Sequence, residues 1–255
     1  MMRPIHTLTV LLSAGCILAT AANREGISPP RPADSVSVDI SVLDNGFPIR
    51  AFSVALPSVK QADTFFDFVE NDLAPAGINT LVVRVNWAYD FESRPELADP
   101  DGWNRALAGR LAALCREKGI RLVPLINLLG HQSWHGKAGK LLQVYPQFDE
   151  KPRVKLPENY VWPNPDRLYC KSYCPNHPEV HDVVFDCVDE VVEAFGATDF
   201  HAGLDEVFDL ADTDCPRCGG LDPAEVFAGE VNRIAAHLRR KGVRLWMSVS
   251  YTHLT

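Results

Sequence analysis

The sequence predicts an α/β fold of the (β/α)8 barrel type, with about five βα units present. Three observations support this prediction. From residue 36 onward, strand-like apolar runs alternate with helix-like stretches. The expected helix ends are followed by Gly77, Gly119 and Gly242, as is usual just past a helix end. A doubly wound open sheet is the alternative, but it usually carries a glycine-rich loop after its first strand, and "ALPSVKQAD" is not one.

Five runs of apolar, often β-branched residues are the expected parallel strands. The run 79–87 is continuous, which is typical of a parallel strand that is buried on both faces. The run 47–56 is separated from the strand-like run 36–43 by Asp44-Asn45-Gly46, a strong turn signal. The other expected strands are 120–129, 199–204 and 243–249.

The intervals between the expected strands contain apolar residues at helical spacing, which predicts helices there. In the first interval, Phe65, Phe66, Val69 and Leu73 share one stripe. The expected helices are 59–74, 103–114, 180–195 and 223–241.

A complete barrel has eight strands and usually needs about 250 residues. Five strands leave the first and the fifth with unpaired edges, which is an aggregation hazard. We therefore expect an incomplete, C-terminally truncated barrel that is poorly soluble or inactive by itself.

The N-terminal segment is expected to direct export. An apolar stretch covers residues 8–18, and Ala19-Thr20-Ala21 is a small-residue cleavage site. In the alternative, a lipoprotein signal, Cys16 would carry the anchor. The mature protein is expected in the periplasm or outside the cell. The expected organisation is a signal peptide (1–22), a Pro-rich linker (23–35) and a partial barrel domain (36–255).

Charge and hydropathy narrow the range of partners. The formal net charge of −8 and the pI of about 5.5 argue against a nucleic-acid partner. The apolar stretch 8–18 is too short to span a bilayer permanently. We expect no membrane span and no cofactor.

Polar and aromatic residues follow three of the expected strands. In a barrel, the active groups lie at the carboxyl ends of the strands. These ends carry Trp87 within "NWAY", His131 and Trp134 within "GHQSW", and the adjacent pair Asp205-Glu206. Aromatic faces stack on the apolar side of a pyranose, while polar groups bind its hydroxyls. The coincidence of such groups on one face predicts a sugar site.

The residues around the acidic pair resemble the signature of glycoside hydrolase family 20, the β-N-acetylhexosaminidases. The family pattern His-x-Gly-Gly-Asp-Glu stands here as His201-Ala202-Gly203-Leu204-Asp205-Glu206, with Leu204 in place of the second glycine. Gly130-His131 is similar to the family's Pro-Gly-His, with Leu129 in place of proline. The Asp and Arg that typical members carry around the first strand are not evident in this chain.

The resemblance implies substrate-assisted retaining hydrolysis, in which the 2-acetamido group of the sugar is the nucleophile. Asp205 would orient the acetamide, and Glu206 would be the general acid and base. An ionised carboxylate beside a second carboxyl group favours the protonated form of the latter. His131 and His201 would bind hydroxyl groups or support the site. The implied substrate is a glycan or glycoconjugate with terminal N-acetylhexosamine.

Two other functions stay open at the level of the sequence. One is a non-catalytic carbohydrate-binding barrel, which would not need an acid beside a polarising Asp. The other is a barrel glycosidase of another family that uses two carboxylates on different strands. Asp90 and Glu92 are the nearby candidates for its second acid.

The cysteines suggest a structural role rather than a catalytic one. Cys115 and Cys187 fall in or beside helical stripes and are expected to be buried thiols. A four-cysteine zinc site and disulfide bonds are both open for the remaining close pairs, and we assign no metal. This expected structural knot consists of Cys170, Cys174, Cys215 and Cys218.

Overall fold

The centre of the molecule is a sheet of parallel strands, seen in a computed structural model that describes residues 46–166 and 168–248. The strands lie in the order β1-β2-β3-β6-β7, each parallel to its neighbour. The five predicted parallel strands are therefore confirmed. Their bounds are Ala51–Ala55 (β1), Thr80–Arg84 (β2), Arg121–Leu128 (β3), Asp199–Gly203 (β6) and Arg244–Trp246 (β7).

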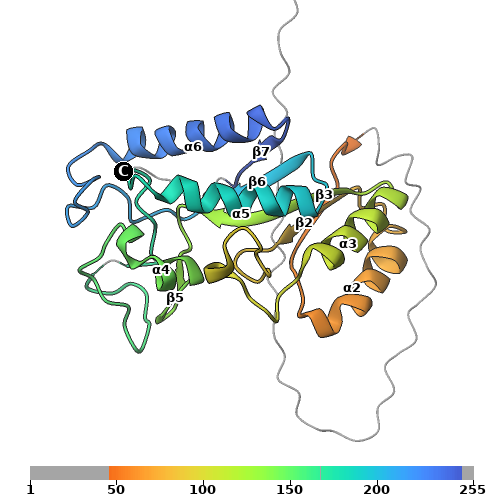
Figure 1. Cartoon of the computed structure of the whole chain (residues 1–255), viewed down its shortest axis with the longest axis horizontal. Helices are drawn as coiled ribbons and strands as arrows, with labels where there is room; N and C mark the ends of the chain where they lie inside the picture. The colour runs from red at the N-terminus through yellow and green to blue at the C-terminus, as the bar shows by residue number, and fades with distance from the viewer. Residues whose placement is uncertain (1–45, 167, 249–255) are drawn as a thin grey trace, which may run out of the picture.

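The strand order settles which kind of α/β fold this is. A doubly wound sheet reverses its strand order at a switch point, whereas here the spatial order follows the chain order throughout. Right-handed crossovers that always proceed in one direction place their helices on one face of the sheet. Figure 1 shows α6, α5, α3 and α2 following one another across the sheet. The arrangement is that of a partial (β/α)8 barrel.

The helices lie where the apolar periodicity predicted them. Asn104 caps the second helix, because its side chain accepts a hydrogen bond from the N–H of Leu107 (3.1 Å). The expected helix 59–74 begins with a 3-10 turn and ends in a π turn. The segments are Val59–Gln61 (3-10), Ala62–Phe68 (α2), Val69–Leu73 (π), Arg105–Glu117 (α3), Val180–Ala194 (α5) and Pro223–Arg240 (α6).

The main core lies between these helices and the sheet. Alternate strand residues such as Leu81 and Val83 face it, together with the apolar stripes of the helices. Cys115 and Cys187 are buried in it, as predicted. The opposite face of the sheet corresponds to the interior of a barrel. It carries a separate small cluster, in which Val82, Val123 and Leu125 pack with Trp246.

A buried carboxylate joins two strands at the amino end of the sheet. Asp199 is fully buried and accepts hydrogen bonds from Arg244 Nε (2.8 Å) and Trp246 Nε1 (2.8 Å). Burial raises the pKa of Asp199, but the hydrogen bonds from Arg244, Trp246 and Thr198 outweigh it and hold that pKa below its usual range. This contact fixes β7 beside β6.

A long insertion between β3 and α5 forms much of the surface beyond the carboxyl ends of the strands. A segment within it, residues 171–174, bonds to Leu129 and Gln132 on one side and to Phe148 and Glu150 on the other. Its small elements are Ser133–Trp134 (β4), Lys137–Ala138 (β5), Lys140–Val144 (α4) and the 3-10 turn Pro146–Phe148. A further 3-10 turn, Pro95–Leu97, lies between β2 and α3.

Some expectations concern parts of the chain outside the described residues. These are the signal peptide with Cys16, the linker 23–35, the strand-like run 36–43 and the residues Asp44-Asn45. Among the described helices, none is both long and apolar enough to cross a membrane.

Candidate active site

The acidic pair lies where two neighbouring strands end. Asp205 and Glu206 follow β6, and His131 follows β3, whose last residue Leu128 pairs with Gly203 at the end of β6. Because the carboxyl ends of parallel strands meet at one edge, His131 reaches both acids. Its Nε2 atom lies 3.5 Å from Asp205 Oδ2 and 3.5 Å from Glu206 Oε2. The structure therefore brings these three predicted site residues together.

The charges within this group support one another. Burial by itself lowers the pKa of His131, but hydrogen bonds to Asp205 and Cys170 raise it to about 10. Burial raises the pKa of Asp205, whereas the hydrogen bond and the charge of His131 outweigh burial and hold that pKa below its usual range. At neutral pH the group therefore contains an imidazolium beside an ionised Asp205.

The backbone around the pair adopts left-handed conformations that residues other than glycine rarely take. Positive φ angles occur at Leu129 (63°) and His131 (55°) after β3, and at Leu204 (70°) and Glu206 (52°) after β6. Each such residue costs on the order of 1 kcal/mol, and this strain commonly gathers at functional sites. Leu204 stands where the family pattern has glycine, so the position retains the glycine-like backbone without the glycine.

A close backbone approach fixes β6 against β3 just below the pair. Gly203 has a φ of 68°, and a Cβ atom there would overlap the side chain of Asn127. Asn127 is in turn held by Asn86, whose Oδ1 accepts a hydrogen bond from the Asn127 N–H (2.9 Å). Glycine is therefore required at position 203. The close contact between β6 and β3 fixes the position of the strand end that Asp205 and Glu206 follow.

Aromatic residues that the sequence reading missed stand beside Glu206. Burial and the hydrogen bond with Glu206 raise the pKa of the Tyr169 hydroxyl. The Tyr169 ring is 5.5 Å from the ring of Trp162 and 5.3 Å from that of Phe208, both of which are about half exposed. The available signal was the density of aromatic residues in the insertion, in "NYVWPNPDRLY" (159–169).

The predicted stacking residue Trp134 belongs to the same rim. Its ring lies 5.2 Å from His135, which lies 5.4 Å from Tyr160. Tyr160 is close enough to the site for the charge of Glu206 to contribute to the raised pKa of its hydroxyl, after burial and Cys170. We call Trp134, Tyr160, Trp162, Tyr169 and Phe208 the aromatic rim. Such rings suit the apolar face of a sugar.

Two other predicted binding residues are placed differently. Trp87 is half-buried and packs against Phe91 (6.2 Å) and the main core. His201 is 3 % exposed within β6, and its Nδ1 accepts a hydrogen bond from the Gly203 N–H (3.0 Å). Burial lowers the pKa of His201 to about 4, so its ring is neutral. In this position His201 supports the turn that carries the acidic pair.

The expected four-cysteine knot needs a correction. Cys174, Cys215 and Cys218 are buried together, but Cys170 lies beside the acidic pair, where it hydrogen-bonds His131 and its Sγ is 4.0 Å from the Glu206 carbonyl oxygen. The group of donor atoms within 4.8 Å of one another around Cys174 includes Cys215 and Cys218 but not Cys170. Cys170 and Cys174 therefore lie too far apart to share one knot. All described cysteines are free thiols.

Two groups of side chains have donor atoms close enough to hold a metal ion. One is His131 with Asp205 and Glu206; the other is Glu150 with the three clustered cysteines. In the first group His131 contacts both carboxylates, so the arrangement suits acid–base chemistry by protein groups. The second group has thiolate donors and is buried.

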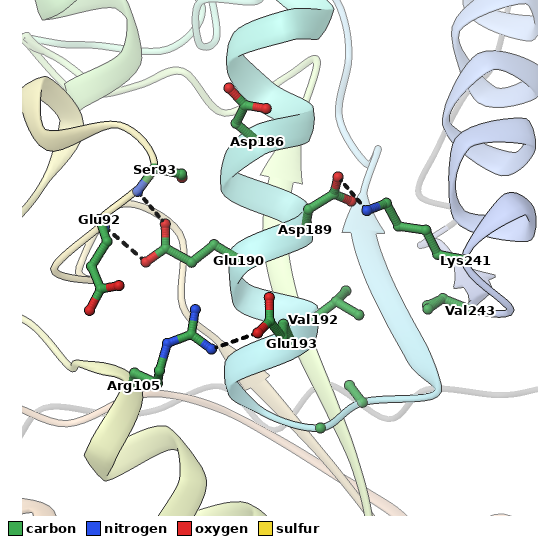
Figure 2. Close-up of a pocket in the computed structure, with 12 residues that line it drawn as sticks. Glu92, Ser93, Arg105, Asp186, Asp189, Glu190, Val192, Glu193, Lys241 and Val243 are labelled. Carbon is green, nitrogen blue, oxygen red and sulfur yellow. Dashed lines mark hydrogen bonds and ion pairs between the residues drawn. The ribbon is translucent and has the colours of Figure 1, made fainter.

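A groove of about 840 Å³ lies away from the acidic pair, in the helix layer. It is lined by α5, by Arg105 of α3, by Glu92 and Ser93, and by the segments that precede β6 and β7. Figure 2 shows that several of its charged side chains have partners within the groove. These contacts are Arg105 with Glu193 (3.0 Å), Lys241 with Asp189 (2.7 Å) and Glu190 with the N–H of Glu92 (2.9 Å).

The groove bears on the two-carboxylate alternative. Glu92 lines the groove and its backbone is held by Glu190 of α5, so it stands in the helix layer rather than across from Asp205 and Glu206. Asp90 is exposed, and its N–H donates to the carbonyl of Trp103 (2.8 Å). These placements disfavour Asp90 and Glu92 as a second catalytic acid.

A curated protein and several solved structures are similar to this chain. No family model matches the chain. Beta-hexosaminidase A of Caenorhabditis briggsae is 29% identical over 136 residues, which are 51% of this chain and 22% of the relative. The chain thus spans about a fifth of the length of this curated relative.

Solved structures of similar enzymes also superimpose on this chain. The chitobiase of Flavobacterium johnsoniae superimposes with a TM-score of 0.62 at 20% identity, covering 78% of this chain and 31% of the chitobiase. A family 20 exo-β-N-acetylglucosaminidase of Vibrio harveyi, solved with N-acetylglucosamine, superimposes with a TM-score of 0.58 at 17% identity, covering 78% and 35%. The resemblance that the Asp205-Glu206 motif indicated is confirmed: in sequence and in fold, the chain is similar to the barrel of the glycoside hydrolase family 20 β-N-acetylhexosaminidases.

Proposed function

We propose that this chain contributes the acid–base half of a β-N-acetylhexosaminidase that removes terminal N-acetylhexosamine from glycans. The observation that carries the proposal is the contact of His131 with both Asp205 and Glu206 at adjoining strand ends. The aromatic rim beside Glu206 adds a surface for a sugar ring. The names of the similar proteins support the same substrate class.

In the proposed reaction, Glu206 gives its proton to the glycosidic oxygen while the C1–O bond breaks. The carbonyl oxygen of the substrate's 2-acetamido group forms the new bond to C1, which gives a cyclic oxazolinium ion. After the second step, the configuration at C1 is retained. Water then attacks C1, Glu206 accepts a proton from that water, and the ring of the intermediate opens. Each step thus uses one proton carrier and no protein nucleophile.

Asp205 has the charge that this reaction requires. An oxazolinium ion is positive, and an ionised carboxylate beside the acetamide N–H stabilises it. His131 holds the pKa of Asp205 below its usual range, which favours the ionised form of Asp205 that this role needs. His131 therefore acts as a positioning residue for both acids, and Tyr169 orients Glu206.

Kinetics of Glu206→Gln and Asp205→Asn in the natural protein that contains these residues test the proposal. General acid–base groups contribute roughly 10²- to 10⁴-fold. Glu206→Gln should lose at least that factor on an alkyl N-acetyl-β-glucosaminide and much less on a nitrophenyl one, whose leaving group needs little protonation. Asp205→Asn should show the same defect with either leaving group.

The substrate itself supplies the control. A β-glucoside without the 2-acetamido group lacks the nucleophile, so the parent enzyme should cleave it very poorly. Equal rates on the plain glucoside and the N-acetyl sugar would contradict the assigned roles. Binding of sugar with no hydrolysis by the parent, and no change on Glu206→Gln, would instead favour the carbohydrate-binding alternative.

Export belongs to the same proposal. The apolar stretch 8–18 and Ala19-Thr20-Ala21 support removal of a signal peptide. N-terminal sequencing of the mature protein should begin near Ala22 or Asn23. A lipid-modified Cys16 at the start would favour the lipoprotein alternative, and an intact Met1 would contradict both.

A further inference from the structure

A buried group of four side chains lies beneath the loops of the candidate active site. Glu150, Cys174, Cys215 and Cys218 are each at most 3 % exposed, and one donor atom from each lies within 4.8 Å of the others. The three sulfurs approach closely, with Cys174 Sγ 3.3 Å from Cys218 Sγ and 3.4 Å from Cys215 Sγ.

Glu150 is the informative member of the group. Its side chain is fully buried, and the groups beside its carboxylate are the three thiols and the backbone of Ala211, with no well-formed hydrogen bond to either oxygen among the described residues. A buried carboxylate is costly unless it is paired or coordinates a metal. The backbone brings Glu150 toward the thiols, because its N–H donates to Ser172 O (3.0 Å) while the N–H of Cys174 donates to Phe148 O (2.6 Å). Glu150 and Cys174 therefore lie on adjacent, paired segments.

The other two thiols come from one tight turn, Cys215-Pro216-Arg217-Cys218. The N–H of Cys218 points at Cys215 Sγ (3.3 Å), so the turn itself supplies a donor to that sulfur. Gly219 closes the turn, since its N–H donates to Cys215 O (3.0 Å) and a Cβ atom there would lie 2.7 Å from that oxygen. The turn thus brings both sulfurs into the group.

The distances fit a metal better than a disulfide. A disulfide requires a sulfur separation of about 2.05 Å and uses two sulfurs only, whereas here Cys174 is nearly equidistant from two partners. Tetrahedral zinc with Zn–S bonds of about 2.3 Å separates its sulfurs by about 3.8 Å. A small outward movement of each thiolate would accommodate the ion.

We propose that Glu150, Cys174, Cys215 and Cys218 bind one structural zinc ion. Four protein donors close the coordination shell, which is the pattern of a structural site rather than a catalytic one. Glu150 and Cys174 belong to the insertion after β3, and Cys215 and Cys218 belong to the loop after β6. The ion therefore ties together the two loops that carry Tyr169 and the Asp205-Glu206 pair.

The metal content of the purified chain, kept with a thiol reductant and without chelator, tests this site. Elemental analysis should find about one zinc ion per chain. Cys174→Ala and Cys218→Ala should lose it. Cys170→Ala is the matched control, because Cys170 is an equally buried thiol in the same insertion but lies outside the group; this variant should keep its zinc.

Two further measurements guard against variants that simply unfold. Glu150→Gln keeps the size of the side chain, so it should fold yet release zinc at a lower chelator concentration than the parent. Cobalt in place of zinc in the parent should give a tetrahedral visible spectrum, with thiolate charge-transfer intensity for three sulfurs. Four thiolates, loss of zinc from Cys170→Ala, unchanged zinc retention in Glu150→Gln, or a parent chain that takes up no zinc would each overturn the proposal.

Discussion

The imidazole Nε2 of His131 lies 3.5 Å from a carboxylate oxygen of Asp205 and 3.5 Å from one of Glu206. One cation therefore contacts two adjacent acids that are each only about one-third exposed. Neighbouring carboxylates repel more strongly as water leaves. The His131 charge offsets that repulsion, so the pair can stand at the end of a strand instead of on a solvated loop.

This contact should make stability depend on pH. The pKa of His131 is raised from its ordinary value near 6.5 to about 10, so its contribution is full below about pH 6.5 and is lost as the pH rises toward 10. The slope between those limits is at most about 1.4 kcal/mol per pH unit. The lowered pKa of Asp205 adds stability that is present above its unfolded value near 3.9 and lost as the pH falls. Urea denaturation of the parent and of His131→Gln should therefore show a stability difference that shrinks from about pH 6 to about pH 9.

A double mutant gives the control for His131. In an Asp205→Asn background, His131 has lost its main hydrogen-bond acceptor. The stability difference that His131→Gln causes should therefore shrink less as the pH rises. The same pH dependence with and without Asp205 would mean that the His131–Asp205 contact does not set it.

Tyr169→Phe should impair catalysis more than binding. The variant removes the hydroxyl that hydrogen-bonds Glu206 but keeps the ring within the aromatic rim. A hydrogen bond to an uncharged group contributes about 0.5 to 1.5 kcal/mol, so kcat should fall roughly two- to tenfold with little change in KM. Phe208→Leu alters the rim without touching the hydroxyl, and it should raise KM instead. Steady-state kinetics of the natural protein that contains this chain would distinguish the two.

At position 204, substitution by glycine should destabilise the protein less than substitution by alanine, which is the reverse of the usual order. Leu204 has a φ of 70°, which costs a residue with a side chain about 1 kcal/mol relative to glycine, while its 1 % exposed side chain belongs to the main core. Leu204→Ala should lose about 2 to 5 kcal/mol of unfolding free energy through the lost packing. Leu204→Gly should be the more stable of the two variants by about 1 kcal/mol, because it relieves the backbone. Chemical denaturation of both variants measures the order, and a more stable Leu204→Ala would show that the backbone at this position is unstrained.

Gly203→Ala should be harmful, while a helical glycine should tolerate the same change. At Gly203 a methyl group meets Asn127 and φ is 68°, so we expect a loss of more than 1 kcal/mol and a displaced acidic pair. Gly229 lies within α6 with nothing within 4 Å of an added Cβ, so Gly229→Ala should stabilise by about 0.4 to 1 kcal/mol. Thermal unfolding compares the two. Equal effects would mean that the approach of β6 to β3 does not require glycine.

The amino-acid sequence by itself determined the alternation of helices and strands and the place of Asp205-Glu206 at a strand end. These features depend on apolar periodicity and on residues that are close together in the chain, such as the Asn104 cap and the glycines after helices. The assignment of Cys115 and Cys187 to the core followed from the same helical stripes. Local rules were sufficient because each element uses its own residues.

Tertiary structure alone decided which distant side chains meet at the site. His131 contacts Asp205 only because β3 and β6 are neighbours, and Tyr169 reaches Glu206 from an insertion that has no periodic pattern. The presence of Glu150, rather than the expected Cys170, beside the three clustered cysteines has the same origin. The backbone holds Cys170 beside the acidic pair and Cys174 in the cysteine cluster, and the pairing of residues 172–174 with residues 148–150 brings the carboxylate in. Sequence spacing limits how far apart two residues can be, but strand pairing decides which of them touch.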